Sequence, residues 1–113
     1  MSDHAATLTR NQVSLLLYLE STLVEYGGTV ESNRMNKDDF DDVPRLTEAG
    51  LIAGFKRVPA KLLGTFARHV THTVDFTEEG WRVAHQLRRE RAERARVSNS
   101  RAKIDAYIAE ATQ

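Results

Sequence analysis

The hydrophobic period changes at Thr77, and this change limits the possible folds more than any other feature of the chain. Before it, side chains in 70–76 alternate as they do in a half-buried strand. After it, three apolar residues recur at helical spacing, namely Trp81, Ala84 and Leu87. Thr77 can cap that helix, and Glu78 and Glu79 suit its positive end. We therefore expect a strand that leads directly into a long helix over 78–96.

Another helix is predicted near the N-terminus. Thr9 and Gln12 have the spacing of a capping box, and Gly27 with Gly28 can end the helix in a left-handed conformation. The apolar residues between them cover two adjacent faces, which comprise Val13, Leu16, Leu17 and Val24 and then Leu15, Leu19, Leu23 and Tyr26. Such a wide arc is explained either by the chain's own core or by additional contact with a second subunit.

The region between this helix and the hairpin is predicted to be mixed. Residues 29–34 are compatible with a short strand. One or two short helical turns follow and end at Gly50, with Asn36 or Asp38 as N-cap. Pro44 suits a first helical turn, because its missing N–H needs no partner there.

A hairpin with a long tip is predicted next. Residues 51–58 form one strand, closed by Pro59, and 69–77 form the returning strand. The tip at 59–68 is ambiguous, because several apolar residues also recur at helical spacing, namely Leu62, Leu63, Phe66, Ala67 and Val70. We favour an irregular or briefly helical tip.

The last predicted element is a short helix with Ser100 as its N-cap. Its apolar face consists of Ile104, Tyr107, Ile108 and Ala111. A helix of this length is marginal in isolation, so we expect it to dock on another surface. The chain then divides into a flexible N-terminus at 1–8, a domain at 9–96 that includes the long helix, and a short C-terminal helix at 97–113 that contacts a dimer partner.

Composition excludes several classes of protein. The 113 residues suit one domain with a modest core. The chain has no cysteine, so disulfides, thiolate metal sites and a cysteine nucleophile are excluded. It has no phosphate loop, nucleophile elbow or zinc-protease motif, and we expect neither an enzyme nor a cofactor or metal site. No apolar run is long enough to span a membrane and no signal peptide is evident, so a cytoplasmic protein is expected.

Charge is distributed unevenly, although the formal net charge is zero. Residues 1–31 carry one base against four acids, whereas 54–72 carry four bases and no acid. Within 88–96, Arg88, Arg89 and Arg91 either reach a phosphate backbone or face solvent in ion pairs, and we favour the second interpretation. A basic segment in a neutral chain indicates a surface for an acidic partner such as nucleic acid.

The sequences LTEAGLI at 46–52 and VDFTEEGWRVAHQL at 74–87, separated by the basic hairpin, resemble the winged-helix core of MarR- and PadR-type transcriptional regulators. The resemblance covers about 10–90. It implies a mainly α fold with a small β-hairpin, arranged as a winged helix-turn-helix with a C-terminal helical dimerisation extension. It also implies a recognition helix that ends near Gly50, a two-stranded wing, and a homodimer that binds double-stranded DNA.

Two sets of site residues follow from this resemblance and from the charges. The expected DNA contacts are Arg34, Asn36, Lys37, Arg45, Lys56, Arg57, Lys61 and Arg68. The expected dimer interface comprises Leu16, Leu23, Leu87, Ile104, Tyr107 and Ile108. Gly80 is expected to allow close backbone approach beneath a wing strand, with Trp81 beside it.

The recognition-helix segment departs from the pattern of a DNA reader. It carries four carboxylates, at Asp38, Asp39, Asp41 and Asp42, which would oppose phosphate binding. These side chains form either a solvated face or a docking patch for a basic protein. Our first hypothesis is therefore a homodimeric DNA-binding transcriptional regulator. The second is a winged-helix protein-interaction module, such as an adaptor or anti-repressor, that uses this acidic patch.

Overall fold

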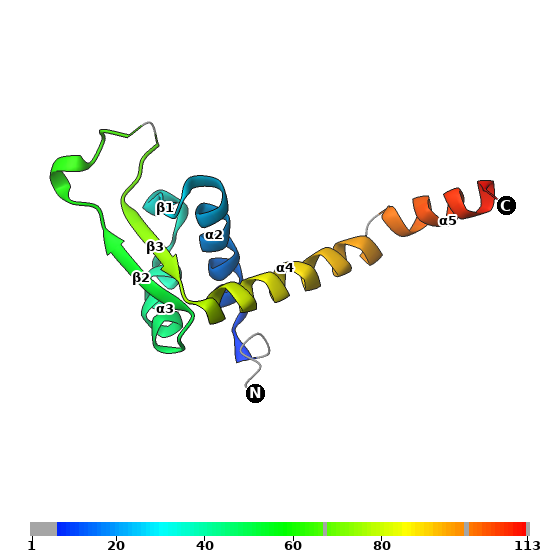
Figure 1. The fold of residues 1–113 in the computed structure, drawn as a ribbon, viewed down its shortest axis with the longest axis horizontal. Coiled ribbons are helices and arrows are strands. Elements are labelled where there is room, and N and C mark those ends of the chain that lie inside the picture. Colours follow the sequence, from blue (N-terminus) through cyan, green and yellow to red (C-terminus); the bar gives the residue numbers. More distant parts are fainter. Residues whose placement is uncertain (1–6, 67, 99, 113) are drawn as a thin grey trace.

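The first long helix, α2 (Arg10–Tyr26), begins and ends where the sequence predicts (Figure 1). The Thr9 side chain accepts a hydrogen bond from the Gln12 backbone N–H at 3.1 Å, and the Gln12 side chain accepts from the Thr9 N–H at 3.0 Å. The helix ends at Gly27, whose φ of 66° is left-handed. This computed structural model describes residues 7–66, 68–98 and 100–112. Most of the segment 1–8, expected to be flexible, lies outside the described residues.

One continuous helix, α3 (Lys37–Glu48), replaces the short helical turns predicted before Gly50. It begins at Asn36, which forms a reciprocal capping box with Asp39 at 2.8 and 3.0 Å. Pro44 lies inside the helix and is exposed, so its prediction in a first turn is wrong. The Asn36 cap starts the helix about two turns earlier than Pro44 alone would suggest.

A small antiparallel sheet has the strand order β1-β3-β2. Its strands are β1 (Thr29–Val30), β2 (Ile52–Arg57) and β3 (His72–Phe76). The predicted hairpin of β2 and β3 is confirmed, and its tip contains the short 3₁₀ turn η2 (Ala60–Leu62). The strand predicted at 29–34 is shorter than expected, because β1 gives way to another 3₁₀ turn, η1 (Ser32–Arg34).

Two further helices complete the chain, namely α4 (Glu78–Ser98) and α5 (Arg101–Ala111). Thr77 caps α4 as predicted, with its hydroxyl accepting from the Gly80 N–H at 2.9 Å. Ser100 precedes α5, but its side chain makes no capping hydrogen bond, so that predicted role is wrong. Figure 1 shows α4 running away from the rest of the protein with α5 beyond its far end, in a molecule that measures 64 × 38 × 24 Å.

The hydrophobic core lies between α2, α3, the sheet and the first half of α4. Its main side chains are Leu15, Leu16, Leu19, Val43, Leu46, Ile52, Val74, Val83, Ala84 and Leu87. A Cβ atom at Gly80 would overlap the carbonyl oxygen of Leu51, so glycine is required for α4 to pack against the start of β2. Trp81 packs edge-on against Phe76, with ring centroids 5.4 Å apart. The predicted role of Gly80 is thus confirmed.

The protein is therefore mainly helical with a small antiparallel sheet, as expected from the sequence. Its elements follow one another in the predicted order of helix, short strand, helix, hairpin, long helix and short helix. Within the described residues, the helices are all too short or too polar to cross a membrane.

Candidate nucleic-acid interface

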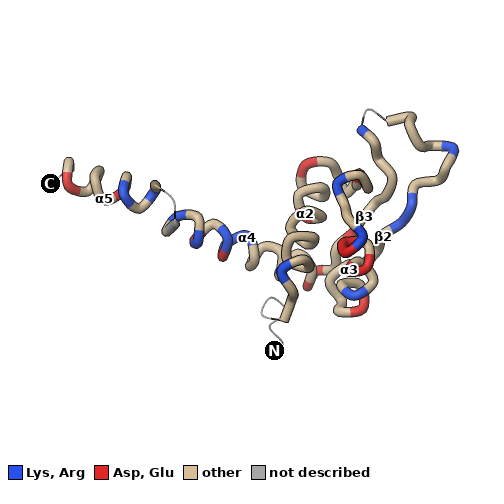
Figure 2. The backbone as a smooth tube through the Cα atoms, turned by 180° about the vertical axis from the view of Figure 1, so that it is seen from behind, with Lys and Arg blue, Asp and Glu red and all other residues tan. Residues whose placement is uncertain are grey.

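The hairpin formed by residues 52–76, called the basic hairpin below, carries three exposed cations. Lys56 and Arg57 lie at the end of β2, and Lys61 lies in η2 at the tip. None of the three makes an ion pair with a residue that the structure describes. The sequence has no acid between Glu48 and Asp75, and Asp75 lies near the end of β3. Figure 2 shows blue segments along β2 and the tip of this hairpin. These cations are therefore available to an anionic partner.

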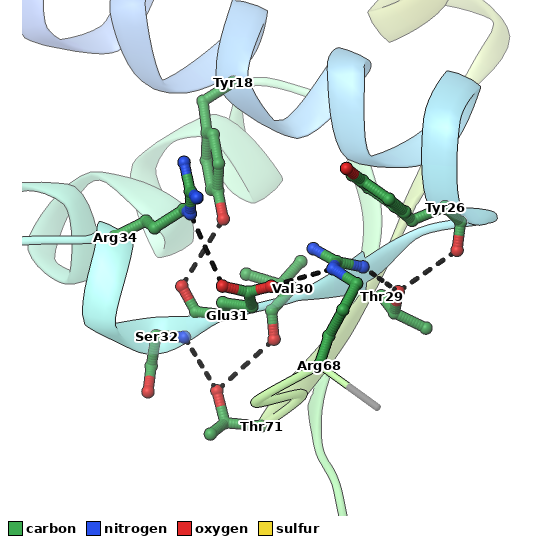
Figure 3. A network of polar contacts seen from close by, with 9 residues as sticks. All are labelled: Tyr18, Tyr26, Thr29, Val30, Glu31, Ser32, Arg34, Arg68 and Thr71. Carbon is green, nitrogen blue, oxygen red and sulfur yellow. Dashed lines mark hydrogen bonds and ion pairs between the residues drawn. The ribbon is translucent and has the colours of Figure 1, made fainter. Parts of the chain in front are cut away.

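Arg68, the fourth predicted cation of the hairpin, has a different role. Its Nε donates to a carboxylate oxygen of Glu31 at 2.7 Å, and its Nη1 donates to the Thr29 hydroxyl at 2.8 Å (Figure 3). Its guanidinium also lies over the Tyr26 ring, 3.5 Å from the centroid, in cation–π geometry. Arg68 is therefore less available to a phosphate than Lys56, Arg57 and Lys61, because its guanidinium already has partners inside the protein.

Glu31 is the centre of a network that ties the base of the hairpin to the body of the protein (Figure 3). Its largely buried carboxylate also accepts a hydrogen bond from Arg34 at 3.4 Å. The Tyr18 hydroxyl on α2 donates to the Glu31 carbonyl at 3.4 Å, and burial raises the pKa of that phenol. The Ser32 N–H donates to the Thr71 hydroxyl at 2.9 Å, which joins η1 to the segment before β3. The hairpin is therefore held at its root as well as through its strands.

The residues on and near α3 that are predicted to contact DNA differ in whether their side chains already have partners in the protein. Lys37 is exposed in the first turn and makes no ion pair with a described residue. Arg34 is mostly exposed but paired with Glu31. The Asn36 side chain serves as a helix cap, and Arg45 pairs with Asp42 at 3.0 Å. Lys37 is therefore the α3 cation best placed to contact a phosphate.

Asp42, predicted to lie on an acidic surface, is 5% exposed and has three side-chain partners. It accepts hydrogen bonds from Asn11 at 2.7 Å, Arg45 at 3.0 Å and Gln12 at 3.3 Å. Burial by itself would raise the pKa of this carboxyl, but the hydrogen bonds outweigh burial and the pKa is lowered. The contact joins the start of α2 to α3.

The acidic patch is consequently smaller than predicted. Asp42 is buried, and the Asp39 carboxylate is used in the capping box at the start of α3. Asp38 and Asp41 remain exposed on the helix. The expectation of a four-carboxylate surface is therefore wrong, because two of the carboxylates stabilise the fold.

An aromatic cluster that sequence reasoning missed fixes α3 against the basic hairpin. The Phe55 and His72 rings stack across the two strands, with centroids 4.9 Å apart. Phe40 from α3 lies 5.7 Å from His72 and 6.4 Å from Phe55. Burial, and to a lesser extent the charge of Arg57, lowers the pKa of His72. The aromatic contacts place α3 and the hairpin next to one another, although the residues lie far apart in the chain.

The three arginines of α4 for which a phosphate contact or ion pairing is expected, Arg88, Arg89 and Arg91, differ in their contacts. Arg88 donates to the buried carboxylate of Glu20 and to the Leu17 carbonyl, so it anchors α4 to α2. Arg89 and Arg91 are exposed and make no ion pair with a described residue. The sequence favours ion pairs for these arginines over phosphate contacts. Arg88 does form an ion pair, but its partner Glu20 lies on α2 and not one turn away on α4.

Three residues predicted for the dimer interface lie within the protomer instead. Leu16 and Leu87 belong to the buried core, and Leu23 packs against it while partly buried. They are not available as a separate interface, because their apolar surface is already covered by the chain itself.

The other three predicted interface residues lie on α5 and are exposed. Ile104 is 51%, Tyr107 74% and Ile108 52% exposed, and no described residue of α5 is buried. Asp105 pairs with Arg101 at 2.9 Å and with Arg96 at 3.5 Å, which holds α5 at the end of α4. This helix thus presents an apolar surface that the described part of the protomer leaves uncovered.

No group of three metal-ligating side chains that could hold an ion occurs in residues 7–66, 68–98 and 100–112. Comparisons with protein-family models, with curated proteins and with solved structures found no match to this chain. Its function is therefore inferred from its own charges and contacts.

Proposed function

We propose that the chain is a homodimeric winged-helix transcriptional regulator that binds double-stranded DNA through the basic hairpin. The observation that carries this proposal is the set of three exposed cations, without ion pairs among the described residues, on a hairpin that has no acid before Asp75. Neutralisation of phosphates by such cations releases counterions and supplies sequence-independent affinity.

The hairpin acts as the wing, with Lys56, Arg57 and Lys61 contacting phosphates. Helix α3 acts as the recognition helix, with Lys37 in its first turn. The burial of Asp42 and the capping role of Asp39 support this assignment, because they reduce the repulsion that α3 exerts on a phosphate backbone. The aromatic cluster keeps the helix and the wing together, so that one duplex can contact both.

The arm formed by residues 78–112 supplies the dimer contact. An 11-residue helix is marginal in isolation, and α5 has exposed apolar side chains beside a few ion pairs. A second copy of the chain provides a matching apolar face. A dimer of this kind binds a palindromic site whose half-sites are about one helical turn of DNA apart.

The rival function, a protein-docking module, depends on the acidic patch of α3. Only Asp38 and Asp41 of the four carboxylates remain exposed there, so the electrostatic basis for a basic protein partner is reduced. That function becomes the leading one if DNA binding fails in the experiment below.

The test is fluorescence anisotropy of the full chain on duplex DNA across a salt series. The wing variant carries Lys56→Ala, Arg57→Ala and Lys61→Ala. The matched control carries Arg89→Ala, Arg91→Ala and Lys103→Ala, which remove the same charge from the arm. Each phosphate contact contributes about 0.9 to the slope of log affinity against log salt, so the wing variant should have a clearly smaller slope than wild type.

The control variant should retain the wild-type slope, because its cations lie away from the proposed contact. Absence of binding at low salt would overturn the proposal. Equal slopes for wild type and wing variant would show that the wing is not the contact, and a loss confined to the arm variant would move the contact to α4 and α5.

A further inference from the structure

The tip of the basic hairpin exposes apolar side chains. Leu62 and Leu63 are each 40% exposed and Phe66 is 49% exposed. Leu62 ends η2 and Leu63 follows it, and this segment forms the part of the hairpin that projects from the protein in Figure 1. Exposed leucines at such a position do not contribute to the fold of the body, so another role is indicated.

Local hydrogen bonds join the backbone of residues 59–65 in the tip. The Leu62 N–H donates to the Pro59 carbonyl at 2.9 Å, and the Leu63 N–H donates to the Ala60 carbonyl at 3.2 Å. The Thr65 N–H and hydroxyl both donate to the Leu62 carbonyl, at 3.2 and 2.7 Å. A segment already joined in this way loses less conformational entropy when it inserts into a partner.

Phe66 has different surroundings from the two leucines. It lines a shallow hollow together with four residues from the end of α2, from β1 and from the base of the hairpin, namely Tyr26, Thr29, Arg68 and Val70. Phe66 thus turns back toward the protein, and Leu62 with Leu63 form the apolar projection.

The charges around this projection favour DNA as its partner. Lys61 precedes the two leucines directly, and Lys56 and Arg57 lie at the end of β2. With no acid on the hairpin before Asp75, the tip is attracted to a polyanion. Cations that contact the backbone while an apolar tip enters a groove are the combination found in proteins that kink DNA.

We propose that Leu62 and Leu63 act as an apolar wedge that enters the minor groove, partly unstacks a base step and bends the duplex. The proposal rests on the DNA-binding function and extends it to the shape of the bound DNA. Since unstacking depends on the step involved, the wedge confers a preference for flexible pyrimidine–purine steps at positions without base-edge contacts.

The experiment measures energy transfer between dyes at the two ends of a short duplex, together with anisotropy. Wild type is compared with a Leu62→Ser, Leu63→Ser variant on two duplexes, one with central TA steps and one with a stiff A-tract. Val24→Ser is the matched control, because Val24 is an exposed apolar residue on α2, outside the hairpin. Circular dichroism verifies that each variant is folded, which is expected because the leucines lie outside the core.

Wild type should bring the duplex ends closer, by a bend of roughly 20° or more, and should prefer the TA duplex by about tenfold. The leucine variant should bind with the wild-type salt slope, because its charges are unchanged, but should lose both the bend and the preference. Val24→Ser should behave as wild type.

Binding by wild type without a bend, or a bend that persists in the leucine variant, would overturn the wedge and leave the proposed function intact. Failure of wild type to bind any duplex would overturn both. If the leucine variant instead changes the sedimentation of the free protein, the tip is a contact between copies and the wedge is wrong.

Discussion

Arg88 on α4 donates two hydrogen bonds, from Nε at 2.9 Å and from Nη2 at 2.6 Å, to one carboxylate oxygen of Glu20 on α2. Nη2 also donates to the Leu17 carbonyl at 3.0 Å. Because Glu20 is buried, these bonds supply the partner that its charge requires. The middle of α4 is therefore fixed to the body by a polar contact as well as by the core.

Replacement of Arg88 by alanine should lower the free energy of unfolding by roughly 2 kcal/mol, because Glu20 would lose a charged donor. The value lies below that for a fully buried pair, since Arg88 itself is partly exposed to solvent. Urea unfolding followed by circular dichroism measures the change. Arg89→Ala is the control and should unfold at the wild-type midpoint; a similar midpoint for Arg88→Ala would refute the anchoring role.

Replacement of Gly80 by alanine should destabilise the protein by about 1–3 kcal/mol, as overpacking does. The added methyl would overlap the Leu51 carbonyl oxygen, and this exceeds the gain in helix propensity. Gly54→Ala is a matched control, because a Cβ there meets nothing within 4 Å. Thermal unfolding of the two variants side by side decides the matter, and equal stabilities would contradict the close packing of α4.

Stability should depend on the ionisation of Asp42. Its pKa in the folded state lies below the ordinary 3.8, so its contribution is fully present above pH 3.8 and is lost as the pH falls through the folded value. An Asp42→Asn variant should be less stable than wild type at pH 7, and the difference should shrink on acidification. Urea titrations at several pH values measure it. Asp41→Asn, at an exposed site, should leave stability nearly unchanged at each pH.

Replacement of Arg68 by alanine should weaken DNA binding several-fold while leaving the salt slope near the wild-type value. Arg68 holds the root of the hairpin through Glu31 and Thr29, so its loss misplaces the wing without removing a phosphate contact. Lys61→Ala should instead reduce the slope by about 0.9. Anisotropy across a salt series separates the two effects. A slope that falls equally in both variants would mean that Arg68 reaches a phosphate.

A Tyr107→Ser, Ile108→Ser variant should be monomeric in sedimentation velocity at concentrations where wild type is dimeric. The two side chains supply much of the apolar surface of α5, so their replacement removes the attraction between arms. Val24→Ser, at an exposed apolar site on α2, should leave the dimer unchanged. A monomeric wild type, or a dimeric α5 variant, would contradict the assigned interface.

Local signals predicted much of the fold. The capping box of Thr9 and Gln12 and the cap at Thr77 depend on residues within one helical turn, and the sequence predicts both. For α3 the sequence predicts only one or two short helical turns, because Pro44 is typical of a first helical turn. The reciprocal cap of Asn36 with Asp39 outweighed it.

The candidate site was harder to predict, because its chemistry depends on distant partners. Asp42 meets Asn11 across 31 positions in the sequence, and Arg68 meets Glu31 across 37. The sequence shows that Asp42 and Arg68 carry charges, but it does not show that each charge has a partner inside the protein. The exposed cations of the hairpin are those for which no such partner occurs among the described residues.

Apolar periodicity has a similar limit. It places Leu16 and Leu87 on the inner faces of their helices, but it does not distinguish the chain's own core from a second copy. The structure assigns both residues to the core of the protomer. For α5 the sequence indicates more, because a short helix with an apolar face is marginal unless that face is covered. In the structure no described residue of α5 is buried.

The length of α4 determines how far α5 lies from the hairpin. Its 21 residues span about 32 Å at 1.5 Å per residue, and its first turn is fixed beneath the hairpin by Gly80. Its first half packs on the body up to Arg88, so in the proposed dimer joined at α5 the half beyond Arg88 would set the distance between the two wings. Insertion or deletion of one helical turn would then change the half-site spacing that a pair of wings can reach, without altering any residue that contacts DNA.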